Sequence, residues 1–451
     1  MNNSSAFNLG TGFIRLGGGV FSVAILSRTW SQSDFGSWAF VTAITTTSAA
    51  LDFGLTIYAG SLSKEDSKGE NYEQKINSIL ILAVVAAGLV SGLLFLLAPW
   101  LVAFIHDEEN QLVVADAISG CAFGLTGGKM LAGVASVILV SQNRYKDLAL
   151  ISSGQVLTIL GVNLATTLTQ SSFNLNLALQ SYATAGWAMI ILIVIRSWAV
   201  QVRGREARIA ACANISSLID TVKKSLSLFA SSLSSLCFSS VDKLIVGSAL
   251  GSKNLAFYTI ASLVAGQINS LSALLVQPII HIVPKVDSNK QAALSLEKYA
   301  NISLIAGPSL GLSLILLSPI IRSIFFPSLH DQNQIFFAEQ SIALMCFIYG
   351  IYSTNCYGYY YLLSRQDFKF ISIVVSISTV LVLLGMVGMG DSFGLLGLVA
   401  CNTAYVITCI LTIVALKGQE KKYRIAFYAF VSISIVSMAC IASKYVMFTL
   451  I

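Results

Sequence analysis

Residues 77–105 read NSILILAVVAAGLVSGLLFLLAPWLVAFI and contain no acidic or basic side chain. The hydrocarbon core of a membrane is about 30 Å thick and is crossed by a helix of about 20 apolar residues, so this stretch is long enough to span it. Of the 451 residues, 55% are hydrophobic and 11% are charged, and the mean hydropathy is +0.78. Soluble domains carry about 25% charged residues. The sequence therefore predicts an all-α polytopic membrane protein without a sizeable soluble domain.

Further apolar stretches of this kind predict twelve spanning helices in two sets, followed by a thirteenth apolar run. The first set is expected at 7–28, 36–60, 77–105, 112–141, 148–169 and 176–198, and the second at 225–246, 256–280, 299–325, 336–363, 369–389 and 393–416. The extra run covers 425–448. The expected domains are an N-terminal lobe (1–198), a basic linker (199–224), a C-terminal lobe (225–416) and a basic loop with the extra C-terminal helix (417–451).

The two lobes repeat one another in sequence. LFLLAPWL (94–101) aligns with LILLSPII (314–321) at an offset of 220 residues, and Arg144 aligns with Arg365 at an offset of 221. Matches at nearly one offset indicate duplication of a six-helix unit. Because six is even, both lobes should share one topology and be related by a pseudo-two-fold axis along the membrane normal. A cavity between them suits alternating access better than a pore or a membrane enzyme.

Basic residues give the expected orientation, because Lys and Arg are enriched in cytoplasmic connectors. They gather in every second connector, which predicts a cytoplasmic N-terminus and a multi-pass topology. The basic clusters lie at 64–75, 144–146, 196–224, 285–298, 365–369 and 417–424. An interfacial amphipathic helix is one interpretation of the cluster within the linker.

Three charged residues lie at the predicted centres of spanning helices: Arg15, Asp52 and Lys129. Each costs about 2.5 to 3.5 kcal/mol to insert, so each is a functional candidate. Arg15 and Asp52 both lie about 12 Å from the cytoplasmic ends of their helices and are expected at the same depth. A structural ion pair and a role in substrate or ion handling both remain open. Two cations against one acid favour an anionic ligand such as a phosphate.

Lys129 follows Gly127 and Gly128, and it has no opposite charge at helical spacing. We therefore expect it to face water or substrate. Arg28 and Asp116 lie near predicted outer helix ends, where long side chains reach the headgroups. Arg28 is a candidate substrate-binding residue and Asp116 a candidate ion-coupling or ion-pair residue, although an interfacial anchor is the favoured interpretation for both.

Signals of other function classes are missing from the sequence. The eight cysteines form no CxxC motif, the three histidines stand far apart, and no nucleotide-binding P-loop occurs. We expect no enzyme activity, no cofactor and no metal site. The net charge of +6 resides mostly in the connectors, which argues against a nucleic-acid partner.

Two stretches carry a family resemblance. RLGGGVFSVAILSRTWSQSDFGSWAF (15–40), followed by LDFGLTIYAG (51–60), resembles the first hairpin of Wzx-type O-antigen flippases. These are polysaccharide transporters of the multidrug and oligosaccharidyl-lipid exporter superfamily. SSVDKLIVGSALGSKNLAFYTIASLVAGQINSL (239–271), with IIHIVPKV (279–286), resembles the helix 7 and 8 region of that family. The resemblance covers about 1–416, and the thirteenth run departs from the family's twelve-helix pattern.

The resemblance implies a two-lobe, MATE-like fold in a bacterial inner membrane. It implies a flippase that moves undecaprenyl-pyrophosphate-linked oligosaccharide outward through a cationic lumen, driven by an ion gradient. The implied partners are this lipid-linked substrate, the bilayer and the glycan polymerase machinery. The family's first-helix arginine matches Arg15 and its second-helix acid matches Asp52, whereas Lys129 rests on the burial argument alone.

Two other functions compete with this one. A drug or metabolite antiporter of the same superfamily would need a central carboxylate without a paired arginine, whereas here Arg15 is expected to face Asp52. A membrane-embedded glycosyltransferase or polymerase would need catalytic residues on a long extracytoplasmic loop, and the sequence predicts no such loop.

Overall fold

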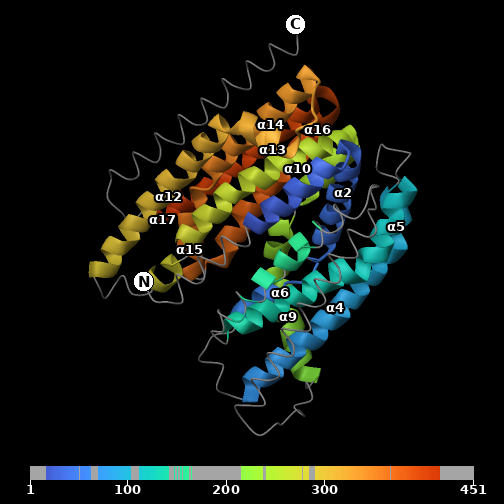
Figure 1. The fold of residues 1–451 in the computed structure, drawn as a ribbon. Helices are drawn as coiled ribbons and strands as arrows, with labels where there is room; N and C mark the ends of the chain where they lie inside the picture. The colour runs from blue at the N-terminus through green and yellow to red at the C-terminus, as the bar shows by residue number, and fades with distance from the viewer. Residues whose placement is uncertain are drawn as a thin grey trace. The chain divides into compact units, whose positions relative to one another are not determined.

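The computed structural model describes residues 17–49, 51–61, 70–102, 111–141, 215–236, 240–276, 278–283, 290–365 and 367–416, with 147, 150, 153–154, 156–161 and 164. These residues form helices and no strands (Figure 1). Within them, six helices are long and apolar enough to cross a membrane, namely Gln74–Val102, Asp242–Val276, Leu294–Leu316, Gln332–Ser364, Lys369–Met389 and Phe393–Ala415. The expectation of an all-α membrane protein is confirmed.

The chain forms two compact units, Met1–Ala256 and Phe257–Ile451. The first contains a helical stretch at 17–29, then α2 (Gln32–Ala49), α3 (Leu55–Ser61), α4 (Glu70–Val102), α5 (Gln111–Cys121), the π-helix η3 (Ala122–Gly127), α6 (Gly128–Ser141), α9 (Ile215–Leu236) and the start of α10 (Asp242–Val276). The second contains the rest of α10, α11 (Ile279–Ile282), α12 (Lys290–Leu316), α13 (Ser318–Phe325), α14 (Gln332–Tyr352), α15 (Asn355–Ser364), α16 (Phe368–Cys401), the 3-10 helix η6 (Asn402–Cys409) and α17 (Ile410–Ala415).

Several predicted helices lie partly or wholly outside the described residues. These are 176–198, 425–448 and most of 148–169. The boundary between the two compact units falls inside α10, and the lobe boundaries around the linker 199–224 stay predictions. The offset of the internal repeat recurs in the helices, because α4 and α12 begin 220 residues apart.

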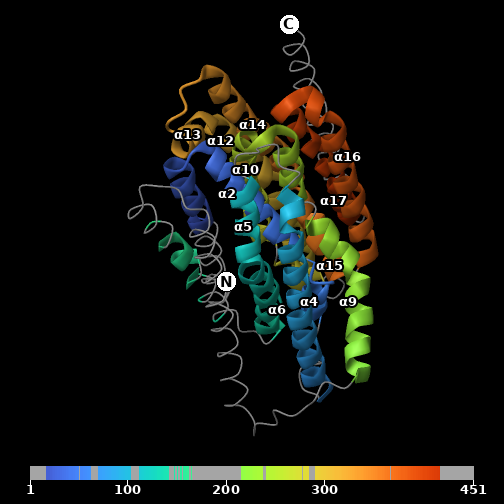
Figure 2. The ribbon, with the colours of Figure 1, turned by 90° about the vertical axis from the view of Figure 1, so that its right-hand side faces the viewer.

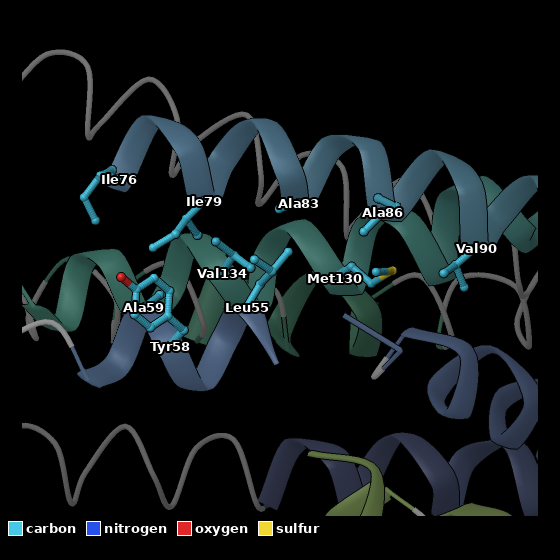
Figure 3. Packing of buried hydrophobic residues seen from close by; sticks show 11 residues of the cluster. Leu55, Tyr58, Ala59, Ile76, Ile79, Ala83, Ala86, Val90, Met130 and Val134 are labelled. Atoms are coloured by element: carbon cyan, nitrogen blue, oxygen red, sulfur yellow. The ribbon is translucent and has the colours of Figure 1, made fainter. Parts of the chain in front are cut away.

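The core of the first unit forms where α3, α4 and α6 meet (Figure 3). Small residues on α4, such as Ala83 and Ala86, let the neighbouring helices approach closely. Leu55 and Tyr58 of α3 and Met130 of α6 fill the space beside them. This packing holds α6 against both α3 and α4, and it thereby sets the direction in which the start of α6 points.

The predicted continuous helix at 36–60 is wrong. The chain leaves the helical conformation between α2 and α3, where Phe53 has φ 53° and Gly54 has φ 80°. Only glycine adopts such positive φ values without strain, so the sequence Asp52-Phe53-Gly54 ends one helix and starts the next. The predicted helix at 336–363 is also interrupted, by Ser353 and Thr354.

Polar side chains compensate the interruption between α14 and α15. The carbonyl oxygen of Thr354 accepts hydrogen bonds from Ser303 Oγ (3.2 Å) and Thr412 Oγ1 (2.8 Å), and Gly358 N–H donates to Thr412 Oγ1 (3.1 Å). Asn355 Nδ2 donates to Thr408 Oγ1 at 2.7 Å. A broken helix is tolerated in a membrane protein when neighbouring side chains satisfy the freed backbone groups, as they do here.

The first turns of α2 pack closely against the start of α10, within the first unit. A Cβ added at Gly36 would overlap the carbonyl oxygen of Ser252, and one added at Gly247 would lie 2.8 Å from the Phe40 ring. The hydroxyls of Ser33 and Ser252 are 3.0 Å apart. Side chains larger than hydrogen at Gly36 would therefore force these two segments apart.

Candidate functional site

Lys129 lies in the first turn of α6, directly after the π-helix η3. The wider π turn is rare, and it occurs frequently at functional sites because it changes the direction of the side chains around it. A Cβ added at Gly127 would lie 3.1 Å from Ser91 Oγ of α4, so the backbone here runs close to its neighbour. Gly128 and Met130 are buried, whereas Lys129 between them is exposed.

Two hydrogen bonds join this segment to α2. Lys129 Nζ donates to Thr46 Oγ1 at 2.7 Å, and Thr126 Oγ1 donates to the carbonyl oxygen of Thr45 at 3.3 Å. Because Thr46 is neutral, it orients the ammonium group without cancelling its charge. No described acidic residue pairs with Lys129. The arrangement can therefore present a positive charge to an anionic group that reaches α2 and α6.

Asp52 occupies the interruption between α2 and α3, and its carboxylate is buried. Oδ1 accepts a hydrogen bond from Gly54 N–H and Oδ2 accepts one from Thr56 N–H, both at 2.9 Å. This is the arrangement of a residue that caps the start of a helix. The structure thus gives Asp52 a local structural role, which the prediction of an unbroken helix had concealed. The predicted pair with Arg15 stays a prediction, because Arg15 lies outside the described residues.

The capped interruption and Lys129 belong to one part of the first unit. Gly133 lies one helical turn after Lys129, and a Cβ added there would be 3.4 Å from Thr56 Oγ1. Lys129 itself contacts Thr46, so the two contacts of α6 lie on either side of the interruption that contains Asp52. Figure 3 shows Met130 and Val134 of α6 beside Leu55, at the start of α3.

The other predicted site residues lie on exposed surfaces. Arg28 is exposed near the end of the helical stretch 17–29, and Asp116 is exposed on α5. Neither forms an ion pair with a described residue, and no described contact joins either to Lys129. Arg322, near the end of the predicted helix 299–325, forms an ion pair with Glu339, near the start of the predicted helix 336–363, with Nε and Oε1 3.1 Å apart.

Sequence reasoning missed two features of this region. The π-helix η3 was read as regular helix, although Gly127 and Gly128 mark a weak point in it. Asp242 lies near the outer end of the predicted helix 225–246, where its burial is not evident from the sequence. Its side chain is buried at the start of α10, where Oδ1 accepts a hydrogen bond from Lys243 N–H at 2.8 Å and lies 3.9 Å from Lys243 Nζ. Over the residues that the structure describes, no three His, Cys, Asp or Glu side chains gather as metal ligands would.

Comparison with solved structures shows the fold. The lipid II flippase MurJ in an inward closed conformation matches with a TM-score of 0.67 and 15% identity, over 97% of this chain and 92% of that chain. An inward-facing multidrug resistance MATE family transporter of the MOP superfamily matches with a TM-score of 0.65 and 11% identity, over 96% of this chain and 99% of that chain. The eukaryotic MATE transporter AtDTX14 matches with a TM-score of 0.64 and 12% identity, over 95% of this chain and 98% of that chain. The MATE-like fold expected from the sequence is confirmed.

Comparison with curated proteins gave no significant match. A family model described as polysaccharide biosynthesis protein matches residues 3–281, more than half of the chain. This range includes residues 15–60 and 239–271, whose sequences resemble oligosaccharide flippases, as well as α2, η3 and Lys129. The chain therefore belongs to the polysaccharide biosynthesis protein family and is an integral membrane protein with the helical fold of MurJ and the MATE transporters.

Proposed function

We propose that this protein is a flippase that moves undecaprenyl-pyrophosphate-linked oligosaccharide, such as an O-antigen repeat unit, from the cytoplasmic to the periplasmic leaflet of a bacterial inner membrane. The membership of a polysaccharide biosynthesis family supports the substrate class. The likeness in fold to a lipid II flippase supports transport by alternating access. Coupling to an ion gradient, a cytoplasmic N-terminus and a glycan polymerase as partner belong to the same proposal.

The observation that carries the proposal is the exposed ammonium group of Lys129. It lies in a predicted spanning helix, its hydrogen-bond partner Thr46 is neutral, and the residues on either side of it are buried. A charge in this position is costly unless it meets water or an anion. A pyrophosphate carries several negative oxygens, and it would gain more from such a cation at reduced dielectric than in water. We assign Lys129 to the pyrophosphate, with Arg15 and Arg28 as further candidate cations for the substrate.

A drug or metabolite antiporter is the second candidate, because the fold is shared with MATE transporters. A cation-extruding antiporter would use a central carboxylate that can exchange a proton or an ion. Both oxygens of Asp52 already accept backbone hydrogen bonds, which disfavours this use of Asp52. Asp116 is exposed on α5 and stays the other candidate for ion coupling.

The test is complementation of a deletion strain. Loss of the protein should make lipid-linked repeats accumulate on the cytoplasmic face, and long surface glycan should disappear. Lys129→Gln should fail to restore surface glycan at normal membrane levels, Lys129→Arg should restore part of it, and the exposed Lys253→Gln should restore it fully. Normal surface glycan in the deletion strain, without a second transporter, would remove the flippase proposal, and a fully active Lys129→Gln protein would remove Lys129 from the site.

A further inference from the structure

The first three turns of α9 carry an exposed apolar stripe. Ile215, Ile219, Val222 and Leu226 are all exposed, and Ile215 reaches 73%. Since successive residues of a helix are about 100° apart, these four side chains lie within an arc of about 60°. Large apolar side chains that gather on one exposed face mark a surface that contacts a partner or a membrane.

Another side of α9 is held on the first unit, and the stripe faces away from it. Thr221 and Ser225 are buried on that side. The hydroxyls of Ser217 in α9 and Ser78 in α4 are 3.0 Å apart, and the two helices lie side by side (Figure 2). The stripe therefore cannot turn inward without breaking the contact between α9 and α4.

Charged side chains share these three turns with the stripe. Lys224 Nζ lies 2.7 Å from Asp220 Oδ2, and this hydrogen bond raises the pKa of Lys224, so the two charges largely compensate each other. Lys223 borders the stripe, is exposed, and has no ion pair or hydrogen bond with any described residue. Charged groups are costly in hydrocarbon, so this segment fits the headgroup level of a membrane rather than its core.

The charge of the segment that precedes α9 indicates which kind of molecule covers the apolar stripe. Residues 199–214 precede α9 and contain Arg203, Arg205 and Arg208 against a single acid, Glu206. This stretch adds positive charge directly before α9 in the sequence, which favours an acidic occupant of the stripe. An acidic phospholipid offers acyl chains for the apolar side chains and a phosphate for the lysine.

We propose that residues 215–226 of α9 form a binding surface for acidic phospholipids. The stripe of Ile215, Ile219, Val222 and Leu226 inserts beside the acyl chains, and Lys223 contacts the headgroup phosphate. Lys224 does not belong to this surface, because it lies about 140° around the helix from the nearest residue of the stripe, and Asp220 compensates its charge. This surface is separate from Lys129, and the inference does not depend on which substrate the protein moves.

The experiment uses the full-length protein in a neutral detergent, titrated with phosphatidylglycerol or phosphatidylcholine. The readout is the lipid concentration that gives the half-maximal rise in Tm. Phosphatidylglycerol should act at a lower concentration than phosphatidylcholine. Lys223→Gln should raise the phosphatidylglycerol value about fivefold, as expected for one lysine near an anionic surface. Lys223→Arg should leave the half-maximal phosphatidylglycerol concentration unchanged, and Ile219→Asn should raise it as Lys223→Gln does.

Two further measurements separate lipid binding from damage to the fold. The Tm of Lys223→Gln without lipid should equal that of the unsubstituted protein. Lys224→Gln removes a neighbouring charge that lies on the far side of the helix from the stripe, so it should leave the half-maximal concentration unchanged, as should Lys253→Gln, an exposed lysine on α10. Equal action of the two lipids, or an equal rise in Lys223→Gln and Lys224→Gln, would overturn the proposal. Stabilisation by soluble polyglutamate but not by phosphatidylglycerol would overturn it in favour of an acidic protein partner.

Discussion

At the scale of single residues, Asp52 allows a structural and a transport role to be separated. Asp52→Ala removes both hydrogen bonds to the start of α3, and we expect a loss of about 0.5 to 2 kcal/mol, the usual cost of losing a helix cap. Asp52→Asn keeps a side-chain oxygen and should lose less. Thermal unfolding of the purified variants measures both effects, with Asp116→Ala, exposed on α5, as the control.

Transport by the same variants then tests ion coupling. If Asp52 only caps α3 and compensates Arg15, Asp52→Asn should transport, and Arg15→Gln combined with Asp52→Asn should transport better than Arg15→Gln alone. A stable Asp52→Asn protein that no longer transports would instead assign a titrating role to this carboxylate. Rescue by the double variant would remove Arg15 from the substrate site.

Residue identity alone predicted part of this site. Lys129 was found because a charge inside an apolar stretch needs an explanation. The structure shows it exposed between buried neighbours, and its role in substrate binding stays a prediction. The cap at Asp52 was missed because the apolar pattern continues through the interruption from Leu51 to Leu55. The positive φ values of Phe53 and Gly54 arise from local hydrogen bonding, which hydrophobic periodicity does not report.

At the scale of elements, the interruption between α14 and α15 depends on Thr412. Thr412→Val removes one donor to the Thr354 carbonyl and the acceptor for Gly358 N–H. Leaving such buried groups without partners should lower stability by about 1 to 3 kcal/mol, seen as a lower Tm. Thr412→Ser should keep most of this stability, because its hydroxyl can make the same hydrogen bonds. Thr379→Val is the matched control, because that hydroxyl donates only within its own helix. An equal Tm loss in the control variant would contradict this role of Thr412.

Helix lengths followed from composition, whereas changes of helix type did not. The predicted gap at 390–392 between two helices lies beside Gly394, which has φ 59° and divides α16. In contrast, η3 and η6 shift the backbone hydrogen bonds by one residue, to i→i+5 and i→i+3, inside stretches whose hydrophobicity predicts one continuous helix. The sequence predicts a helix that begins at 225, whereas α9 begins at Ile215. The apolar pattern does not identify the earlier start, because charged residues lie in the first turns of α9.

At the scale of the whole molecule, the number of spanning segments fixes the sides of the two termini. If all thirteen predicted helices span the membrane and the N-terminus is cytoplasmic, as proposed, Ile451 lies on the periplasmic side. A reporter fused after Ile451 should therefore be active there, and one fused after Leu416, the last described residue, should be active in the cytoplasm. A cytoplasmic signal from both fusions would mean that residues 425–448 do not cross the membrane.

At the close contact between α2 and the start of α10, an engineered disulfide can hold the two segments together. The hydroxyls of Ser33 and Ser252 are 3.0 Å apart, close enough for two cysteines at these positions to form a disulfide. If transport separates the two segments, oxidation of the Ser33→Cys/Ser252→Cys protein should stop glycan export, and a reductant should restart it. Each single cysteine variant should be insensitive. Undiminished export by the cross-linked protein would mean that this contact stays closed throughout the cycle, and that the moving parts lie elsewhere.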